Sequence, residues 1–173
     1  MKTLAVLLTA LLFTCELVPP TAVPALTNEQ AAALMPQGAS YCYTDEETGF
    51  LLYEESSRFG LLNQQGDIVL PPTYVQPFYF SSGLAAVRRP EGFAYLWPDG
   101  TELISGLDDA YPFEGEYAIA IYREHYGLLD KTGAWVLPPE YDELDAPEGG
   151  TCRAVKDEKE LLLDIPGWQE AEK

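Results

Sequence analysis

Short hydrophobic runs alternate with turn residues along most of the chain, and three segments share one pattern. In each, an aromatic residue, a small residue and two apolar residues lead into a four-residue turn ending in glycine, and a second apolar run follows. The aromatic residues are Phe59, Phe93 and Tyr126, so the copies lie 34 and 33 residues apart. A repeat of about 33 residues, with apolar runs too short for helices, predicts tandem β-hairpins.

The turn residues of the three copies are typical of a type I turn followed by a left-handed glycine. Asn63 and Asp130 can accept hydrogen bonds from the turn backbone, and Pro98 fixes φ at the second position of the middle turn. Each turn closes on a glycine, which adopts a positive φ without steric cost. These glycines are Gly66, Gly100 and Gly133. We therefore expect hairpins whose returning strands cover residues 67–70, 101–104 and 134–137.

Two prolines follow the first and third returning strands, in segments that end at Tyr74 and Tyr141. Because proline cannot donate to a ladder, we expect these prolines to end the strand in an extended turn. A further apolar strand is predicted next in each copy, at residues 84–87, 117–120 and, more loosely, 152–155. The sequence thus predicts an all-β fold of tandem antiparallel hairpin repeats, at residues 41–165, that stack into a curved array.

These motifs resemble the WG-repeat family. Its units run from an aromatic-glycine pair through an Asp-x-x-Gly hairpin and a Pro-Pro-x-Tyr segment to a Phe-x-x-Gly-Leu-Ala strand. The positions that define the repeat here are Phe59, Gly60, Gly66, Tyr74, Phe93, Gly100, Tyr126, Gly127, Gly133 and Tyr141. The copies are degenerate, since none has a literal Trp-Gly, Ala94 replaces one glycine, and the middle unit lacks Pro-Pro-x-Tyr. The resemblance implies a repeat scaffold without shared catalytic residues.

Residues 1–25 are typical of a secretory signal peptide. Lys2 precedes an apolar run, and small residues near Ala25 suit a cleavage point. Cys15 offers an alternative route, a lipid anchor, although Thr14 stands where the lipoprotein motif takes glycine, alanine or serine. We expect a secreted or otherwise extracytoplasmic protein with no transmembrane segment after signal removal.

The segments that flank the repeats differ from them in pattern. Residues 26–40 predict a short helix and a linker, with a Thr-x-x-Gln capping box that begins at Thr27. Residues 41–53 predict an incomplete leading hairpin. Residues 166–173 are polar around Trp168 and predict a frayed tail.

Two cysteines, Cys42 and Cys152, remain after the predicted leader. In an exported protein such a pair can form a disulfide, which constrains the unfolded chain. The alternative is two buried free thiols, because a bridge requires Cα atoms within about 7 Å.

The chain carries a formal net charge of −18, which disfavours nucleic acid and anionic lipid as partners. Acidic clusters at residues 45–47, 108–109 and 142–145 could hold Ca²⁺. They lack the ordered ligand spacing of a calcium loop, so we interpret them as turn residues. We predict no metal or cofactor site.

Catalysis is not predicted either, and no catalytic residue is assigned. The single histidine, His125, occupies the repeat position that Arg58 fills in the first copy, so we interpret it as a solvated strand residue. We interpret the repeat aromatics as interlocking core residues, namely Phe59, Tyr74, Phe93, Tyr126, Trp135 and Tyr141. The leading hypothesis is an exported, non-catalytic interaction module that binds a protein or a cell-envelope component. The alternative is a glycan-binding or carboxylate-dependent glycan-hydrolysing protein, which would need exposed aromatics beside two close carboxylates.

Overall fold

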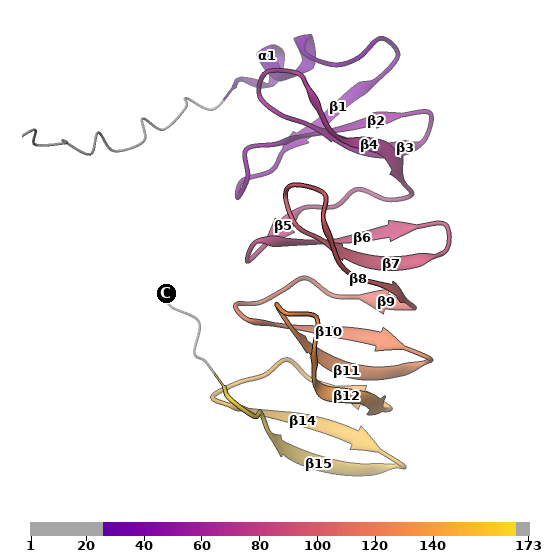
Figure 1. The fold of residues 1–173 in the computed structure, drawn as a ribbon, viewed down its shortest axis with the longest axis vertical. Helices are drawn as coiled ribbons and strands as arrows, with labels where there is room; N and C mark the ends of the chain where they lie inside the picture. Colours follow the sequence, from indigo (N-terminus) through magenta and orange to yellow (C-terminus); the bar gives the residue numbers. More distant parts are fainter. Residues whose placement is uncertain (1–25, 169–173) are drawn as a thin grey trace, which may run out of the picture.

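The computed structural model describes residues 26–168, which form one short helix and four small antiparallel sheets that follow one another along the chain (Figure 1). The sheets stack into a column, so the predicted all-β repeat fold is confirmed. The helix α1 (Asn28–Ala33) precedes the first sheet, which contains β1 (Ser40–Thr44), β2 (Leu51–Glu55), β3 (Arg58–Leu62) and β4 (Ile68–Tyr74). The second sheet contains β5 (Phe80–Ser81), β6 (Leu84–Arg89), β7 (Gly92–Leu96) and β8 (Glu102–Leu107). The third contains β9 (Asp109–Ala110), β10 (Tyr117–Tyr122), β11 (His125–Asp130) and β12 (Trp135–Tyr141), and the fourth contains β13 (Glu143–Leu144), β14 (Thr151–Lys156) and β15 (Lys159–Asp164).

The three predicted hairpins are the pairs β3–β4, β7–β8 and β11–β12. Asn63 Oδ1 accepts hydrogen bonds from the backbone N–H groups of Gln65 and Asp67, both at 2.9 Å, and Asp130 does the same in the third hairpin. The closing glycines have φ values of +88°, +84° and +81°, in the left-handed region. The predicted turn chemistry is confirmed, and the leading hairpin exists as the antiparallel pair β1–β2.

The double prolines lie inside the returning strands, so the expectation that they end the strands is wrong. β4 and β12 continue through their prolines to Tyr74 and Tyr141. Phe59 pairs with Tyr74 and Leu61 pairs with Leu70, so β3 advances two residues between these pairs while β4 advances four. β4 therefore has two extra residues at this point. Proline is tolerated because β4 and β12 are edge strands and the extra residues form a bulge, where no ladder donor is needed.

This bulge explains the glycine of the aromatic-glycine pair. A Cβ on Gly60 would lie 2.7 Å from the carbonyl oxygen of Leu70 and 2.9 Å from the nitrogen of Pro72. In the middle repeat Ala94 holds the same position. There β7 advances two residues from Phe93 to Tyr95 while β8 uses three from Leu107 to Ile104, so this bulge has one extra residue instead of two. The alanine and the missing Pro-Pro-x-Tyr, both interpreted above as signs of degeneracy, are therefore structurally linked, because the alanine occurs where the bulge is smaller.

Apolar side chains alternate between the two faces of each sheet, and a core fills each junction between consecutive sheets. At the first junction, Leu52 and Leu61 meet Val87 and Leu96. The second and third junctions are filled in the same way. The repeat aromatics contribute to these cores: Tyr74 and Tyr141 are buried, while Phe59, Phe93, Tyr126 and Trp135 are half-buried against them. Their interpretation as interlocking core residues is confirmed.

Residues outside the three hairpins pack onto the first sheet and into the third junction. α1 has the predicted capping box between Thr27 and Gln30, and its Ala31 packs against the outer face of the first sheet. In the third junction, Trp168 stacks on Tyr117 of β10 with ring centroids 5.3 Å apart, within the core that the third and fourth sheets share. Residues 166–168 are therefore part of the packed structure, and only the later part of the predicted tail lies outside the described residues.

Cys42 and Cys152 are both free thiols, so the disulfide alternative is wrong. Cys42 lies in β1 of the first sheet and Cys152 in β14 of the fourth, at opposite ends of the column (Figure 1). Cys152 is buried, and burial raises the pKa of its thiol, whereas Cys42 is exposed.

The predicted signal peptide and Cys15 lie outside the described residues. Within residues 26–168, no helix is long and apolar enough to cross a membrane.

Two-residue turns in the first, third and fourth sheets are a feature that the sequence analysis did not predict. The turns at Ser56–Ser57, Arg123–Glu124 and Asp157–Glu158 have positive φ at both residues, as type I′ turns require. None contains glycine or asparagine, the residues that adopt this conformation most easily. These turns are therefore locally strained, and the sheets around them hold them in place.

Candidate functional site

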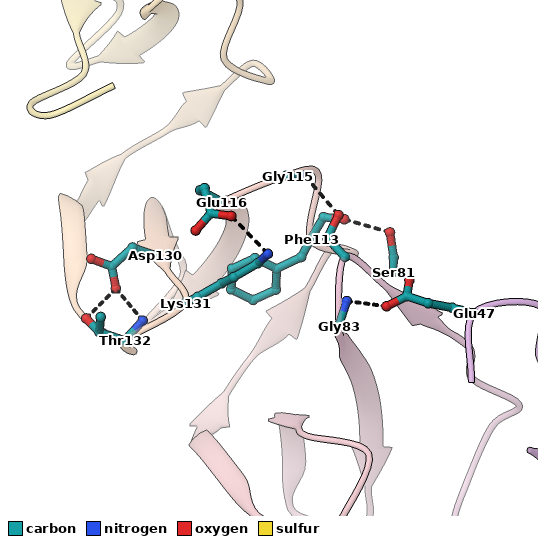
Figure 2. Close-up of polar contacts among 10 residues, drawn as sticks. Glu47, Ser81, Gly83, Phe113, Gly115, Glu116, Asp130, Lys131 and Thr132 are labelled. Carbon is teal, nitrogen blue, oxygen red and sulfur yellow. Dashed lines mark hydrogen bonds and ion pairs between the residues drawn. The ribbon is translucent and has the colours of Figure 1, made fainter. Parts of the chain in front are cut away.

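Tight turns before the second strand of each sheet lie along one edge of the column, and polar contacts join them across the junctions (Figure 2). Glu47, between β1 and β2, accepts a hydrogen bond from the backbone N–H of Gly83, between β5 and β6. Ser81 donates its hydroxyl to the carbonyl of Phe113 at 2.6 Å. These contacts link the first sheet to the second and the second to the third.

A groove of about 700 Å³ opens beside this edge, between the first and second sheets. It is lined by Tyr43, Thr44, Asp45, Glu46, Glu47, Tyr79, Phe80 and Ser81. Its volume lies within the range of about 300–1,000 Å³ that is usual for ligand sites. The described grooves of the other junctions are smaller, about 160 Å³ at the second junction and about 120 and 240 Å³ at the third. The first junction also has the longer connection, since residues 45–50 join β1 to β2 while residues 82–83 join β5 to β6.

Asp45 fixes one wall of the groove. Its side chain is buried, and Oδ1 accepts hydrogen bonds from the backbone N–H and the hydroxyl of Thr48 at 2.9 and 2.7 Å. Oδ2 accepts from the backbone N–H of Phe80 at 2.8 Å. Because Phe80 begins the second sheet, one carboxylate both closes the turn and holds the two sheets together.

Tyr43 forms an aromatic wall that is held by its hydroxyl. This hydroxyl donates to the carbonyl of Phe78 at 2.5 Å, in the segment between the first two sheets. Burial, followed by the negative charge of Asp45, raises the pKa of Tyr43 to about 12. The side chain is therefore uncharged at neutral pH, and its ring adds apolar surface to the groove.

Exposed groups at the groove combine an aromatic ring with carboxylates. Tyr79 is 53% exposed, and Glu46 and Glu47 are also exposed. Among the described residues that line the groove, none is lysine, arginine or histidine. The site thus offers negative charge together with an exposed aromatic ring, a combination that attracts cations.

The acidic clusters outside the groove serve the turns, as predicted. Asp108 Oδ2 accepts a hydrogen bond from the backbone N–H of Glu124 at 2.8 Å, and Asp142 Oδ2 accepts one from that of Asp157 at 2.8 Å. Both N–H groups belong to strained type I′ turns of the following hairpin. Over residues 26–168, no three or more His, Cys, Asp or Glu side chains are grouped as metal ligands would be.

His125 lies where the sequence analysis places it. It is exposed at the start of β11, opposite Tyr122 across a two-residue turn. Its interpretation as a solvated strand residue is confirmed.

The recurring unit is thus a hairpin in which the returning strand carries two prolines in a bulge, and this bulge packs against the glycine of the aromatic-glycine pair. A family model described as "WG containing repeat" matches residues 59–89 and 126–159, the first and third copies of this unit. The chain belongs to the WG-repeat family. The middle WG repeat, with Ala94 and a smaller bulge, falls between the two matched segments. No curated protein and no solved structure matches the chain.

The groove is a feature that sequence reasoning missed. Glu46 and Glu47 were recognised only as part of an acidic turn, and Tyr79 was not singled out. One signal was present, because Phe80 and Phe113 occupy the same position of successive WG repeats, and the residue before them changes from Tyr79 to Pro112. A tyrosine that departs from the repeat pattern is not explained by the repeat core.

Proposed function

We propose that this WG-repeat protein is an exported, non-catalytic interaction module that binds a protein or a cell-envelope component. The observation that carries the proposal is the groove of about 700 Å³ between the first and second sheets. It is the largest of the described grooves along the edge, and its exposed groups have no role in the repeat cores.

The distribution of aromatic residues supports a binding surface at this place. The aromatics that recur with the repeat period are packed between sheets, where they stabilise the stack. Tyr79 and Tyr111 are instead exposed, with exposed fractions of 53% and 45%. Tyrosine is favoured at interfaces because its large, stiff ring buries much surface at little entropic cost.

Site-specific photo-crosslinking tests this function. A photoreactive phenylalanine analogue replaces Tyr79 in one variant and Ile68, an exposed residue on β4, in the other. Both proteins are incubated with the envelope fraction of the producing cells and irradiated. A discrete adduct from position 79 and none from position 68 supports the proposal, and no adduct from either position contradicts it.

Export needs a separate test. Fractionation of the producing cells, followed by N-terminal sequencing, should give an extracytoplasmic protein that starts near Leu26. A protein that keeps Met1 and remains in the cytoplasm would contradict export without affecting the binding proposal.

Glycan binding is the second candidate, and Tyr79 beside Glu46 is the observation that favours it. An exposed ring can stack on a sugar, and carboxylates can accept hydrogen bonds from its hydroxyls. Titration with neutral oligosaccharides of the cell envelope separates the two candidates. Glycan binding predicts saturable association that Tyr79→Ala removes and that added salt leaves unchanged.

A further inference from the structure

We propose that the groove at the first junction receives a lysine or arginine side chain from a basic segment of a protein partner. This inference rests on the proposed binding function and specifies the chemistry of the partner. Three features of the groove carry it: its aromatic walls, its charge, and the contrast with the other two junctions.

The walls suit a long aliphatic chain that ends in a positive charge. Tyr43 and Phe80 provide apolar surface that is held in place by the packing between the sheets. Tyr79 adds a ring that is 53% exposed at the groove. A lysine or arginine side chain can bury its methylene groups against such rings and keep its charged end near solvent.

The charge of the groove is entirely negative. Asp45, Glu46 and Glu47 contribute three carboxylates, and no described basic residue lines the groove to offset them. Asp45 and Glu47 are held by hydrogen bonds to Phe80 and Gly83, so their charges keep fixed positions between the two sheets. Glu46 is exposed and can turn toward an incoming cation. The net charge of −18 attracts a basic partner over a longer range.

The other two junctions lack this combination. The groove of the second junction shares Tyr79 but has no charged residue in its lining. At the third junction, one groove has only Glu114, and the other combines two carboxylates with the basic Lys131. The volumes of these three grooves, about 160, 120 and 240 Å³, are also much smaller. The cation site is therefore specific to the first junction, and the third junction provides matched control positions.

A peptide titration tests the inference. The purified protein is titrated into a fluorescein-labelled peptide of alternating arginine and glycine, and fluorescence anisotropy reports the Kd. The comparison peptide has glutamine in place of arginine. The groove variants are Glu46→Gln and Tyr79→Ala, and the control variants are Glu114→Gln and Tyr111→Ala.

We expect the arginine peptide to bind and the glutamine peptide not to bind. Each groove variant should raise the Kd about two- to fivefold, as expected for the loss of one exposed ion pair or one exposed cation–π contact. The control variants should leave the Kd unchanged. Salt at about 1 M, where the Debye length is about 3 Å, should weaken binding strongly.

Three results would overturn the inference. If the control variants weaken binding as much as the groove variants, the peptide is held by diffuse charge alone. If the glutamine peptide binds equally well, charge is not recognised. If only a neutral oligosaccharide binds, and does so through Tyr79, the groove is a glycan site. A crosslinked adduct at position 79 would still support the interaction module in each case, so the two proposals fail separately.

Discussion

Alanine at Gly60 tests the physical explanation of the aromatic-glycine step. Gly60 has no positive φ, so alanine can adopt its backbone conformation. The added Cβ would lie 2.7 Å from the carbonyl oxygen of Leu70, 2.9 Å from the nitrogen of Pro72 and 2.9 Å from a ring carbon of Tyr53. Two of these are backbone atoms of β4, which can move only if the bulge opens. The cost therefore arises from crowding and not from backbone strain.

The magnitude follows from two opposing effects. Overpacking in a well-packed site costs about 1–3 kcal/mol. Replacing glycine by alanine also restricts the unfolded chain, which stabilises the fold by about 0.4–1 kcal/mol. We expect Gly60→Ala to lower the free energy of unfolding by about 1–2 kcal/mol. Urea titration, followed by tryptophan fluorescence and circular dichroism, measures the change as a shift of midpoint at constant slope.

A second background makes the test specific. Replacing Pro71-Pro72-Thr73 with Ser-Gly copies the shorter bulge of the middle repeat, where Ala94 is accommodated. In this background Gly60→Ala should cost less than about 0.5 kcal/mol, so the two changes should show a coupling energy of about 0.5–2 kcal/mol. Equal costs in both backgrounds would refute the reasoning, as would a Gly60→Ala protein as stable as the natural one.

Three other predictions concern single residues. Glu124→Gly should raise stability by about 0.5–1 kcal/mol, because glycine adopts a φ of +68° without strain and keeps the backbone N–H that donates to Asp108. The control Glu91→Gly lies in a turn without positive φ at that residue and should lower stability; thermal unfolding measures both changes. Asp45→Ala should destabilise the protein by about 2–3 kcal/mol and speed hydrogen exchange of the Phe80 amide, since a buried N–H loses its acceptor; unchanged exchange would contradict the bridging role. Because the folded-state pKa of Tyr43 is about 12 and its ordinary value is 10, the stability that the neutral hydroxyl contributes is complete below pH 10 and is lost as the pH rises toward 12. Tyr43→Phe should therefore reduce the alkaline loss of stability, measured by urea titrations between about pH 9 and 11.5.

The repeat period and the hairpin turns were predictable because their causes are local. Asn63 and Gly66 act within one turn, so their residue types alone indicate the conformation that they adopt. Alternating apolar positions likewise indicate which residues fill the cores. Local rules of this kind can be applied before any long-range contact is known.

The errors concern features that depend on strand pairing. Prolines break an ordinary strand, and only the edge position of β4 and its bulge make Pro71 and Pro72 acceptable inside it. The disulfide failed for a similar reason, since the stacking order that places Cys42 and Cys152 at opposite ends of the column depends on how all four sheets assemble. The groove was missed because it arises where turns of two different sheets approach each other.

The outward face of the fourth sheet differs from the corresponding face of the third. Arg153 pairs with Leu162 on the side of the sheet away from the third core, at positions that Ile119 and Leu128 hold in the third sheet. Arg153 forms ion pairs with nearby carboxylates, those of Glu143, Asp145 and Glu160. Exposed pairs of this kind add little stability, but burying them beneath another sheet would cost their hydration. In addition, Leu161 of β15 occupies the repeat position that Gly127 holds in β11. A bulged proline strand paired with β15 would therefore collide with the Leu161 side chain, as β4 would collide with an alanine at position 60. The outer face of the fourth sheet thus combines the Arg153 ion pairs with Leu162, which is 75% exposed, and only its charged part has the polar character of a capping repeat.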